Sequence, residues 1–306
     1  MKSEFPRQFT DSQSTFERLI PHREMSALQW PSGGTKVFAV FGDPVEHSLS
    51  PVLLNAAFTA TELDAVYVAL RISAEDLEGA VLGVRSMGFG GASVTMPHKE
   101  RIIGHLDRVT ERAKKLNSVN CIFWDGGELV GDSTDGPALV SSLEAEMGKT
   151  VAERSVVVLG TGGAARAIIL ALAEAGVGKV IVVGRSPETV ASLVVLGGPC
   201  VRAGTLLDVA NVEIVVNATS VGMAGTTGEG RTLVPAELIT SSHFVYDIIY
   251  HPLMTPLLRD ALAAGAGVSN GIGMLVHQAA RAFQIWTRKT APLEAMFQSV
   301  RSSPRF

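Results

Sequence analysis

The segment from Ser155 to Gly176 constrains the fold of this chain more than any other, because a β-branched run, a glycine-rich turn and an alanine- and leucine-rich stretch follow one another in it. This order predicts a strand, a tight loop and a helix. Gly160 suits the sharp turn, Gly162 leaves room for a pyrophosphate, and Ala165 lets the helix pack closely on the strand. Such a loop alone is often a plain turn. With a strand before it and a helix after it, the segment predicts dinucleotide binding by Gly160, Thr161, Gly162, Gly163 and Ala164.

The next predicted strand, which begins at Lys179, is followed by Arg185. NAD-binding units usually place an acidic residue here to bind the ribose 2′-hydroxyl, whereas a basic residue suits a 2′-phosphate. Arg185 therefore favours NADP. NAD stays possible, because Glu188 lies close by and a single arginine can also be a solvated surface charge.

Length and composition set limits on the class of protein. With 306 residues, 46% of them hydrophobic, the chain is long enough for two globular domains. With a net charge of −4, the chain lacks the excess of basic residues that is typical of nucleic-acid-binding proteins. Cys121 and Cys200 have neither disulfide nor metal-ligand spacing. We expect a cytoplasmic protein with a small-molecule substrate, no metal and no membrane or nucleic-acid partner. Residues 1–34 are read as a polar extension without an apolar core of signal-peptide type.

Strands and helices also alternate in the first half of the chain. Strands are expected over 36–42, 65–70 and 90–96, the last one ended by Pro97. This alternation predicts a second open α/β sheet, in which ligands bind beyond the carboxyl ends of the strands. Thr95 and Lys99 lie at such an end, although an exposed lysine would be the ordinary explanation of Lys99.

Two serines stand before the first predicted helix. Pro51 suits the first helical position, which would make Ser50 the N-cap. The simplest interpretation of Ser50 is that cap alone. Ser48 and Ser50 share one side of an extended loop, however, so two hydroxyls and a helix N-terminus could together hold a carboxylate.

Further polar side chains flank elements later in the chain. Asp135 lies just before a helix expected over 137–147, where a carboxylate complements the helix dipole or could bind a substrate hydroxyl. Strands are expected over 212–217 and 244–249, and the polar residues at their ends are Asn217, Thr219 and Tyr250. In the last long helix Met274 and Gln278 share a face, and the amide of Gln278 stands among apolar residues.

Several motifs together resemble the shikimate dehydrogenase family, including its quinate/shikimate branch. The matching stretches occur in the family's order between about Val37 and Trp286, and they are 47–51 (HSLSP), 94–99 (VTMPHK), 118–120 (SVN), 131–136 (GDSTDG), 160–164 (GTGGA), 217–223 (NATSVGM) and 271–279 (GIGMLVHQA). The resemblance implies a substrate-binding domain over 35–136, completed by helices over 271–306, and a Rossmann-like NAD(P)-binding domain over 137–270.

The resemblance also implies roles for single residues. Ser48 and Ser50 would hold the substrate carboxylate, and Lys99 and Asp135 would form the catalytic pair. Residues expected to bind the rest of the substrate are Thr95, Asn120, Tyr250 and Gln278. Beyond the glycine loop and Arg185, cofactor contacts are expected from Asn217, Thr219, Gly271 and Met274. Because lysine is ordinarily protonated at neutral pH and a neighbouring carboxylate favours that form, we expect Lys99 to donate the proton during carbonyl reduction.

The chain departs from the family pattern at five positions. Ser93 and Ser133 stand where the biosynthetic enzymes usually have asparagine, and Gly184-Arg185-Ser186 replaces an N-R-T motif, with Thr189 where a second basic residue is usual. The leading expectation is an NADP-dependent oxidoreductase, monomeric or homodimeric, that interconverts 3-dehydroshikimate and shikimate. The alternatives are an NAD(P)-dependent dehydrogenase of quinate or a related cyclohexene acid, and a non-catalytic sensor of cofactor and metabolite. Retention of both Lys99 and Asp135 argues against the sensor.

Overall fold

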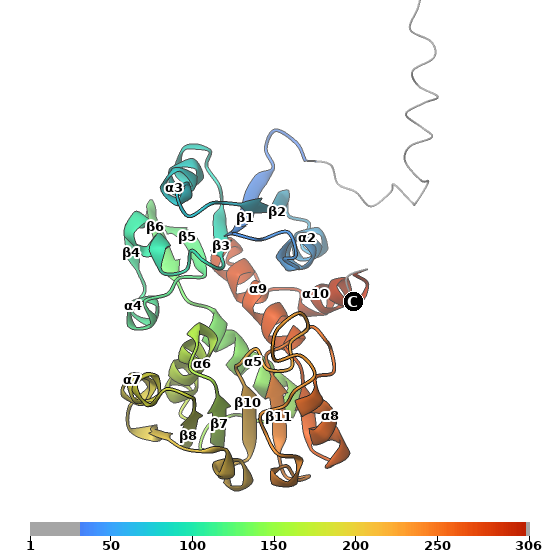
Figure 1. Ribbon diagram of the computed structural model, residues 1–306. Helices are drawn as coiled ribbons and strands as arrows, with labels where there is room; N and C mark the ends of the chain where they lie inside the picture. Colours follow the sequence, from blue (N-terminus) through green and yellow to red (C-terminus); the bar gives the residue numbers. More distant parts are fainter. Residues whose placement is uncertain (1–30, 304–306) are drawn as a thin grey trace, which may run out of the picture.

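The computed structural model describes residues 31–303 and consists of two lobes, each built on a six-stranded sheet (Figure 1). We call the lobe with the sheet of strands β1–β6 the first lobe, and the lobe with β7–β12 the second lobe. The predicted α/β fold, with an open α/β sheet in the first half of the chain and a Rossmann-like sheet in the second half, is confirmed. The expected extension over 1–34 lies outside the described residues except for 31–34. Within 31–303, no helix is both long and apolar enough to cross a bilayer.

The first sheet has the order β2-β1-β3-β5-β6-β4. Its strands are β1 (Lys36–Gly42), β2 (Ala65–Arg71), β3 (Gly91–Val94), β4 (Arg108–Val109), β5 (Cys121–Asp125) and β6 (Glu128–Asp132). Strands β1, β2 and β3 are parallel, whereas β5 and β6 form an antiparallel hairpin. The turn of this hairpin has φ of +62° at Gly126 and +88° at Gly127, which favours glycine at both positions. The helices of this part of the chain are α2 (Ser50–Ala60), α3 (Leu77–Ser86), α4 (Glu111–Leu116) and a 3₁₀ helix over Arg101–His105.

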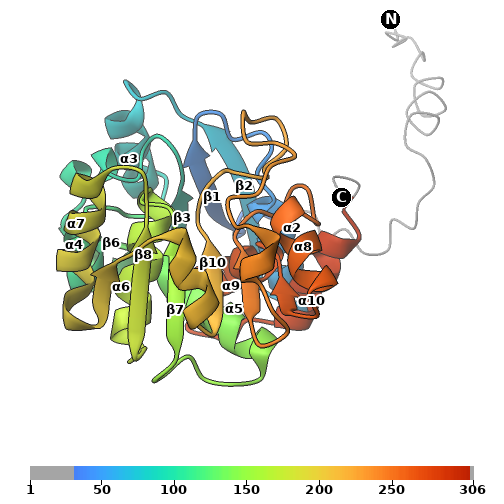
Figure 2. The ribbon, with the colours of Figure 1, turned by 60° about the horizontal axis from the view of Figure 1, so that its bottom comes forward.

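The second sheet is entirely parallel and has the order β12-β11-β10-β7-β8-β9. Its strands are β7 (Ser155–Leu159), β8 (Lys179–Val183), β9 (Val201–Ala203), β10 (Ile214–Asn217), β11 (Phe244–Asp247) and β12 (Gly267–Ser269). Helices lie on both faces of this sheet (Figure 2), so central strands such as β7 are continuous apolar runs. They are α5 (Asp135–Met147), α6 (Gly163–Glu174), α7 (Pro187–Gly197) and α8 (Pro256–Ala263), with short 3₁₀ turns over Gly198–Cys200, Leu206–Asn211 and Ala236–Leu238.

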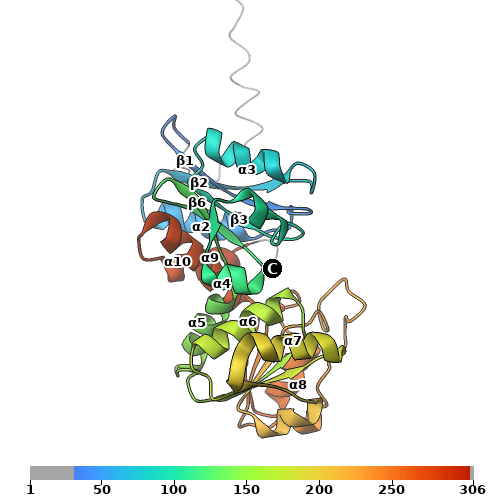
Figure 3. The same ribbon diagram turned by 90° about the vertical axis from the view of Figure 1, so that its left-hand side faces the viewer.

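The chain returns to the first lobe through α9 (Ile272–Thr287) and α10 (Leu293–Arg301). Apolar side chains at helical spacing on α9, from Val276 to Phe283, pack against Phe38, Leu53 and Phe58 of the first lobe. The Trp286 indole N–H donates to the Ile122 carbonyl at 2.9 Å. Figures 1 and 3 show α5 and α9 together at the junction of the lobes, and the two helices pack on each other there.

Two helix starts differ from the sequence-based expectation. Helix α2 begins at Ser50 with Leu49 as its N-cap, so Ser50 is the first helical residue and not the cap. The Ser50 N–H donates instead to Ser48 Oγ at 3.2 Å. Helix α5 begins at Asp135, two residues before Pro137, because proline is tolerated within the first turn of a helix. Asp135 is therefore inside the first turn of α5.

Candidate active site

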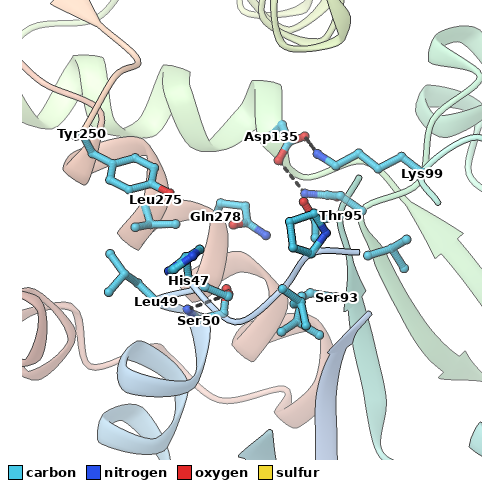
Figure 4. A pocket seen from close by; sticks show the side chains of 16 residues that line it. His47, Leu49, Ser50, Ser93, Thr95, Lys99, Asp135, Tyr250, Leu275 and Gln278 are labelled. Carbon is cyan, nitrogen blue, oxygen red and sulfur yellow. Dashed lines mark hydrogen bonds and ion pairs between the residues drawn. The ribbon is translucent and has the colours of Figure 1, made fainter. Parts of the chain in front are cut away.

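A cavity of about 260 Å³ lies between the start of α2, the carboxyl end of β3, the start of α5 and the middle of α9 (Figure 4). Tyr250, which follows β11, lines it together with residues of the first lobe, so the carboxyl edge of the second sheet faces the first lobe here. The structure brings together in this cavity all eight residues predicted to touch the substrate, namely Ser48, Ser50, Thr95, Lys99, Asn120, Asp135, Tyr250 and Gln278.

Lys99 and Asp135 form an ion pair at one end of the cavity. The distance from Lys99 Nζ to Asp135 Oδ2 is 2.7 Å. The Lys99 side chain is 30% exposed and that of Asp135 18% exposed, so the pair is only partly shielded from solvent. The Lys99 backbone is held because its carbonyl accepts the Val119 N–H at 2.8 Å. Asp135 lies in the first turn of α5, where the helix dipole stabilises a carboxylate.

Asn120 fixes the second oxygen of the Asp135 carboxylate. Its side chain is 1% exposed, and its Nδ2 donates to Asp135 Oδ1 at 2.6 Å and to Thr134 Oγ1 at 3.0 Å. Its Oδ1 accepts the Thr134 N–H at 2.7 Å. Both ends of the amide are therefore used within the protein. Lys99 and Asn120 each hold one oxygen of Asp135, which leaves the carboxylate little freedom to rotate.

Ser50 lies at the start of α2, on the opposite side of the cavity from the ion pair (Figure 4), and Ser48, two residues before it, also lines the cavity. Ser50 is 8% exposed, and the first turn of α2 carries no acidic residue. Two hydroxyls beside the N-terminus of an 11-residue helix form a site suited to a carboxylate. The Tyr67 phenol neighbours Ser50 and Ser93. Complete burial raises the pKa of Tyr67, so this phenol is neutral.

Gln278 and Thr95 lie between Ser50 and the ion pair, as Figure 4 shows. Sequence analysis named Ser93 only as a departure from the family pattern and gave no role to Leu275, and both residues line the cavity. Simple spacing could have found them. Ser93 is two residues before Thr95 on a strand, and Leu275 is three residues before Gln278 on a helix, so each pair shares a face.

The glycine loop has the geometry of an anion site. Gly160 has φ of +112°, and a Cβ there would lie 2.9 Å from the Ala218 carbonyl oxygen. At Gly162 and Gly163, by contrast, a Cβ would meet nothing within 4 Å, so the space in front of α6 is open. Helix α6 has no side-chain cap and no acidic residue in its first turn. Its free N–H groups therefore fit a pyrophosphate.

Arg185 follows β8 and is exposed, and in the part of the chain that the structure describes it has no ion pair. The neighbouring departure from the family motif has a packing reason. A Cβ at Gly184 would lie 2.4 Å from Thr161 Cγ2, so the usual asparagine would require Thr161 to shift. Thr189 Oγ1 donates to Thr161 Oγ1 at 3.2 Å. Thr161 thus packs against the loop that carries Arg185, at Gly184 and at Thr189.

Asn217 and Thr219 form part of a buried network at the ends of β10 and β11. Asn217 Nδ2 donates to Asp247 Oδ1 at 3.0 Å, and its Oδ1 accepts the Thr219 hydroxyl at 2.7 Å. Asp247 also accepts the Thr255 hydroxyl at 2.7 Å, and desolvation raises the pKa of its buried carboxyl. The Asn217 side chain is 2% exposed, so it shapes the loop that follows it.

Gly271 and Met274 lie at the start of α9. A Cβ at Gly271 would stand 2.0 Å from the Ile248 carbonyl oxygen, so glycine is required for this close approach. The Met274 N–H donates to Tyr246 Oη at 2.9 Å. Within residues 31–303, no group of three or more metal-ligating side chains comes together.

The strand order of the second sheet reverses between β7 and β10, which is where doubly wound sheets bind nucleotides. The open glycine loop after β7 and the pair formed by Lys99 of the first lobe and Asp135 of α5 supply an anion site and a proton-transfer group. This fold and this site define the class of two-lobed, dinucleotide-dependent oxidoreductases.

Comparison with known proteins places the chain more narrowly. Residues 40–122 match the shikimate dehydrogenase substrate binding domain, and residues 271–301 match the shikimate 5′-dehydrogenase C-terminal domain. Residues 155–233 match the model of coenzyme F420-dependent NADP oxidoreductases. A shikimate dehydrogenase (NADP(+)) from Methanococcoides burtonii is 42% identical over 270 residues, which cover 87% of this chain and 97% of the relative. The chain belongs to the shikimate dehydrogenase family, as its motifs predicted.

Solved structures agree with this assignment. The shikimate 5-dehydrogenase from Thermus thermophilus, in complex with NADP(H) and shikimate, aligns with a TM-score of 0.79 and 36% identity over 87% of this chain and 99% of that one. The quinate dehydrogenase from Corynebacterium glutamicum, in complex with NAD, aligns with a TM-score of 0.80 and 28% identity over 88% of this chain and 99% of that one.

Proposed function

We propose that this protein is an NADP-dependent shikimate dehydrogenase, which interconverts 3-dehydroshikimate and shikimate by hydride transfer. The observation that carries this proposal is the 2.7 Å pair of Lys99 and Asp135, which opens into the cavity that also contains the serine pair. Membership in the family and the NADP(+)-dependent relative support it. The quinate alternative is less favoured, because the quinate enzyme is less similar to this chain in sequence than the two shikimate enzymes are.

The substrate-side residues divide into those that bind the acid and those that hold the reacting group. Ser48 and Ser50 donate to the carboxylate, with the α2 N-terminus behind them. Thr95, Tyr250 and Gln278 bind the ring hydroxyls. Asn120 acts through Asp135, because both ends of its amide are already bonded inside the protein.

Lys99 moves the proton. In the reducing direction its ammonium group donates a proton to the carbonyl oxygen, while the carbonyl carbon accepts the hydride. Asp135 holds the ammonium group in place at 2.7 Å, and the Lys99 side chain, which is 30% exposed, can regain the proton from solvent. In the oxidising direction Lys99 first gives a proton to water, and the resulting neutral amine takes the hydroxyl proton as the carbon gives up the hydride.

NADP supplies the nicotinamide that accepts or donates the hydride when it is bound. The residues proposed to hold it are Gly160, Thr161, Gly162, Gly163 and Ala164 at the pyrophosphate, Arg185 at the 2′-phosphate, and Gly271 and Met274 on the nicotinamide side. Asn217 and Thr219 contribute by fixing the loop after β10. The division into domains over 35–136 with 271–306 and over 137–270 remains a proposal that agrees with the extent of the two sheets.

Initial rates of cofactor reduction test this function, measured on the purified protein with shikimate or quinate as substrate and NADP⁺ or NAD⁺ as cofactor. We expect the highest kcat/KM with shikimate and NADP⁺. A higher value with quinate and NAD⁺ would support the catabolic alternative. Binding of cofactor and acid in calorimetry without any turnover would support the non-catalytic sensor. Light scattering and cell fractionation would check the expected monomer or homodimer and the expected cytoplasmic location.

A further inference from the structure

The two lobes are joined by α5 and α9. Helix α5 carries one residue of the ion pair, and α9 carries residues proposed to contact the nicotinamide and the substrate. Asp135 is in the first turn of α5, whereas Met274 and Gln278 lie on successive turns of α9. The two helices pack on each other at the junction of the lobes (Figures 1 and 3). Their relative position therefore sets how the ion pair is placed with respect to the nicotinamide side of the site.

A single buried phenol connects the two helices. Tyr246, the third residue of β11, is 0% exposed. Its Oη lies 2.7 Å from Ser142 Oγ of α5 and accepts the Met274 N–H of α9 at 2.9 Å. Ser142 is seven residues, or about two turns, after Asp135, so the two residues share a face of α5.

The contact with Met274 completes the start of α9. The first N–H groups of a helix have no partner within it, and Met274 is the third residue of α9. Gly273 makes the approach possible, because a Cβ there would stand 2.1 Å from Ser142 Oγ and 3.1 Å from Tyr246 Oη. Burial raises the pKa of Tyr246 to about 12, so the phenol keeps its proton at neutral pH.

We propose that Tyr246 is a positioning residue for hydride transfer. Its hydroxyl fixes α5 and α9 relative to each other so that the reacting carbon and the nicotinamide are aligned. This inference rests on the proposed function. It gives a task to a tyrosine that touches neither substrate nor cofactor. Small errors in the distance between reacting atoms cost large factors in rate, so the loss of this contact should appear in the hydride step.

The test is Tyr246→Phe, which removes only the oxygen. We expect kcat to fall by about tenfold or more while the KM for shikimate changes little, because the serine pair is untouched. In the reducing direction, with 3-dehydroshikimate as substrate and NADPH deuterated at C4, the isotope effect on kcat should rise, since hydride transfer becomes more rate-limiting. Ser142→Ala should give part of the same change, and adding it to Tyr246→Phe should change little more, because both remove one contact. Thr287→Val is the matched control, since it removes a hydroxyl at the far end of α9 that donates to the Phe283 carbonyl at 2.7 Å.

Hydrogen exchange of peptides spanning residues 270–280 tests the contact independently of turnover. We expect faster exchange in Tyr246→Phe than in the wild type and in Thr287→Val. A lower melting temperature with unchanged kcat and isotope effect would overturn the inference, as would unchanged exchange. If the wild type does not oxidise shikimate, the proposed function fails, whereas the exchange measurement still decides whether Tyr246 holds the two helices.

Discussion

Replacing Lys99 by methionine tests the proton-transfer role most sharply. The change keeps an unbranched apolar stem of similar length but removes the ammonium group that lies 2.7 Å from Asp135 Oδ2. A positioned general acid or base contributes about 10²–10⁴-fold to rate, which corresponds to about 3–5 kcal/mol in activation free energy. We therefore expect kcat with shikimate and NADP⁺ to fall by at least about a hundredfold.

The fold should survive this substitution. The Lys99 side chain is 30% exposed, and Asp135 keeps its bond from Asn120 at 2.6 Å, so we expect a loss of less than about 2 kcal/mol in unfolding free energy. The assays are initial rates of cofactor reduction and fluorescence titration with NADPH, whose affinity should not change because Lys99 is on the other lobe. Lys115→Ala, at an exposed lysine of α4, is the control and should keep full activity. A Lys99→Met protein that turns over at the wild-type rate would refute the assignment of the proton donor.

Three further predictions concern the acid site, the cofactor and the buried carboxyl. Ser50→Ala should raise the KM for shikimate by about ten- to a hundredfold, since a hydrogen bond to a charged group contributes about 1.5–3 kcal/mol; steady-state kinetics check this, and an unchanged KM would remove Ser50 from the carboxylate site. Arg185→Gln should raise the KM for NADP⁺ by about tenfold and leave that for NAD⁺ unchanged, and equal effects on both would contradict a 2′-phosphate contact. Burial raises the folded-state pKa of Asp247 above its unfolded value, so its contribution to stability is greatest below the unfolded value, about pH 4, and is lost as pH rises through the folded value. Urea unfolding of the wild type and Asp247→Asn across this range should show the wild type losing unfolding free energy relative to the variant as pH rises. A constant difference between the two would argue against the burial effect.

Local chemistry made much of the fold predictable. The run from Ser155 to Gly176 forms β7, the glycine loop and α6 as expected, because strand, turn and helix signals follow one another without conflict. The substrate-side residues were found through motifs, and the structure brings them into one cavity although Ser48 and Gln278 are far apart in the sequence.

Features that depend on contacts between distant segments could not be predicted. Ser50 was expected to be an N-cap from its place before Pro51, but the backbone turns one residue earlier and Ser48 takes the Ser50 N–H. The bonds from Asn120 to Thr134 and Asp135 depend on how the loops after β6 and before β5 meet in space. Only the structure shows that Thr161 lies beside Gly184, where the family usually has asparagine.

A crystal structure of the protein with NADP⁺ and shikimate tests most directly how the acid lies between the lobes. We predict an arrangement with the shikimate carboxylate on the hydroxyls of Ser48 and Ser50, and with the hydroxyl that is oxidised within hydrogen-bond distance of Lys99 Nζ. Shikimate bound with its carboxylate at Lys99, or bound outside the cavity, would contradict it.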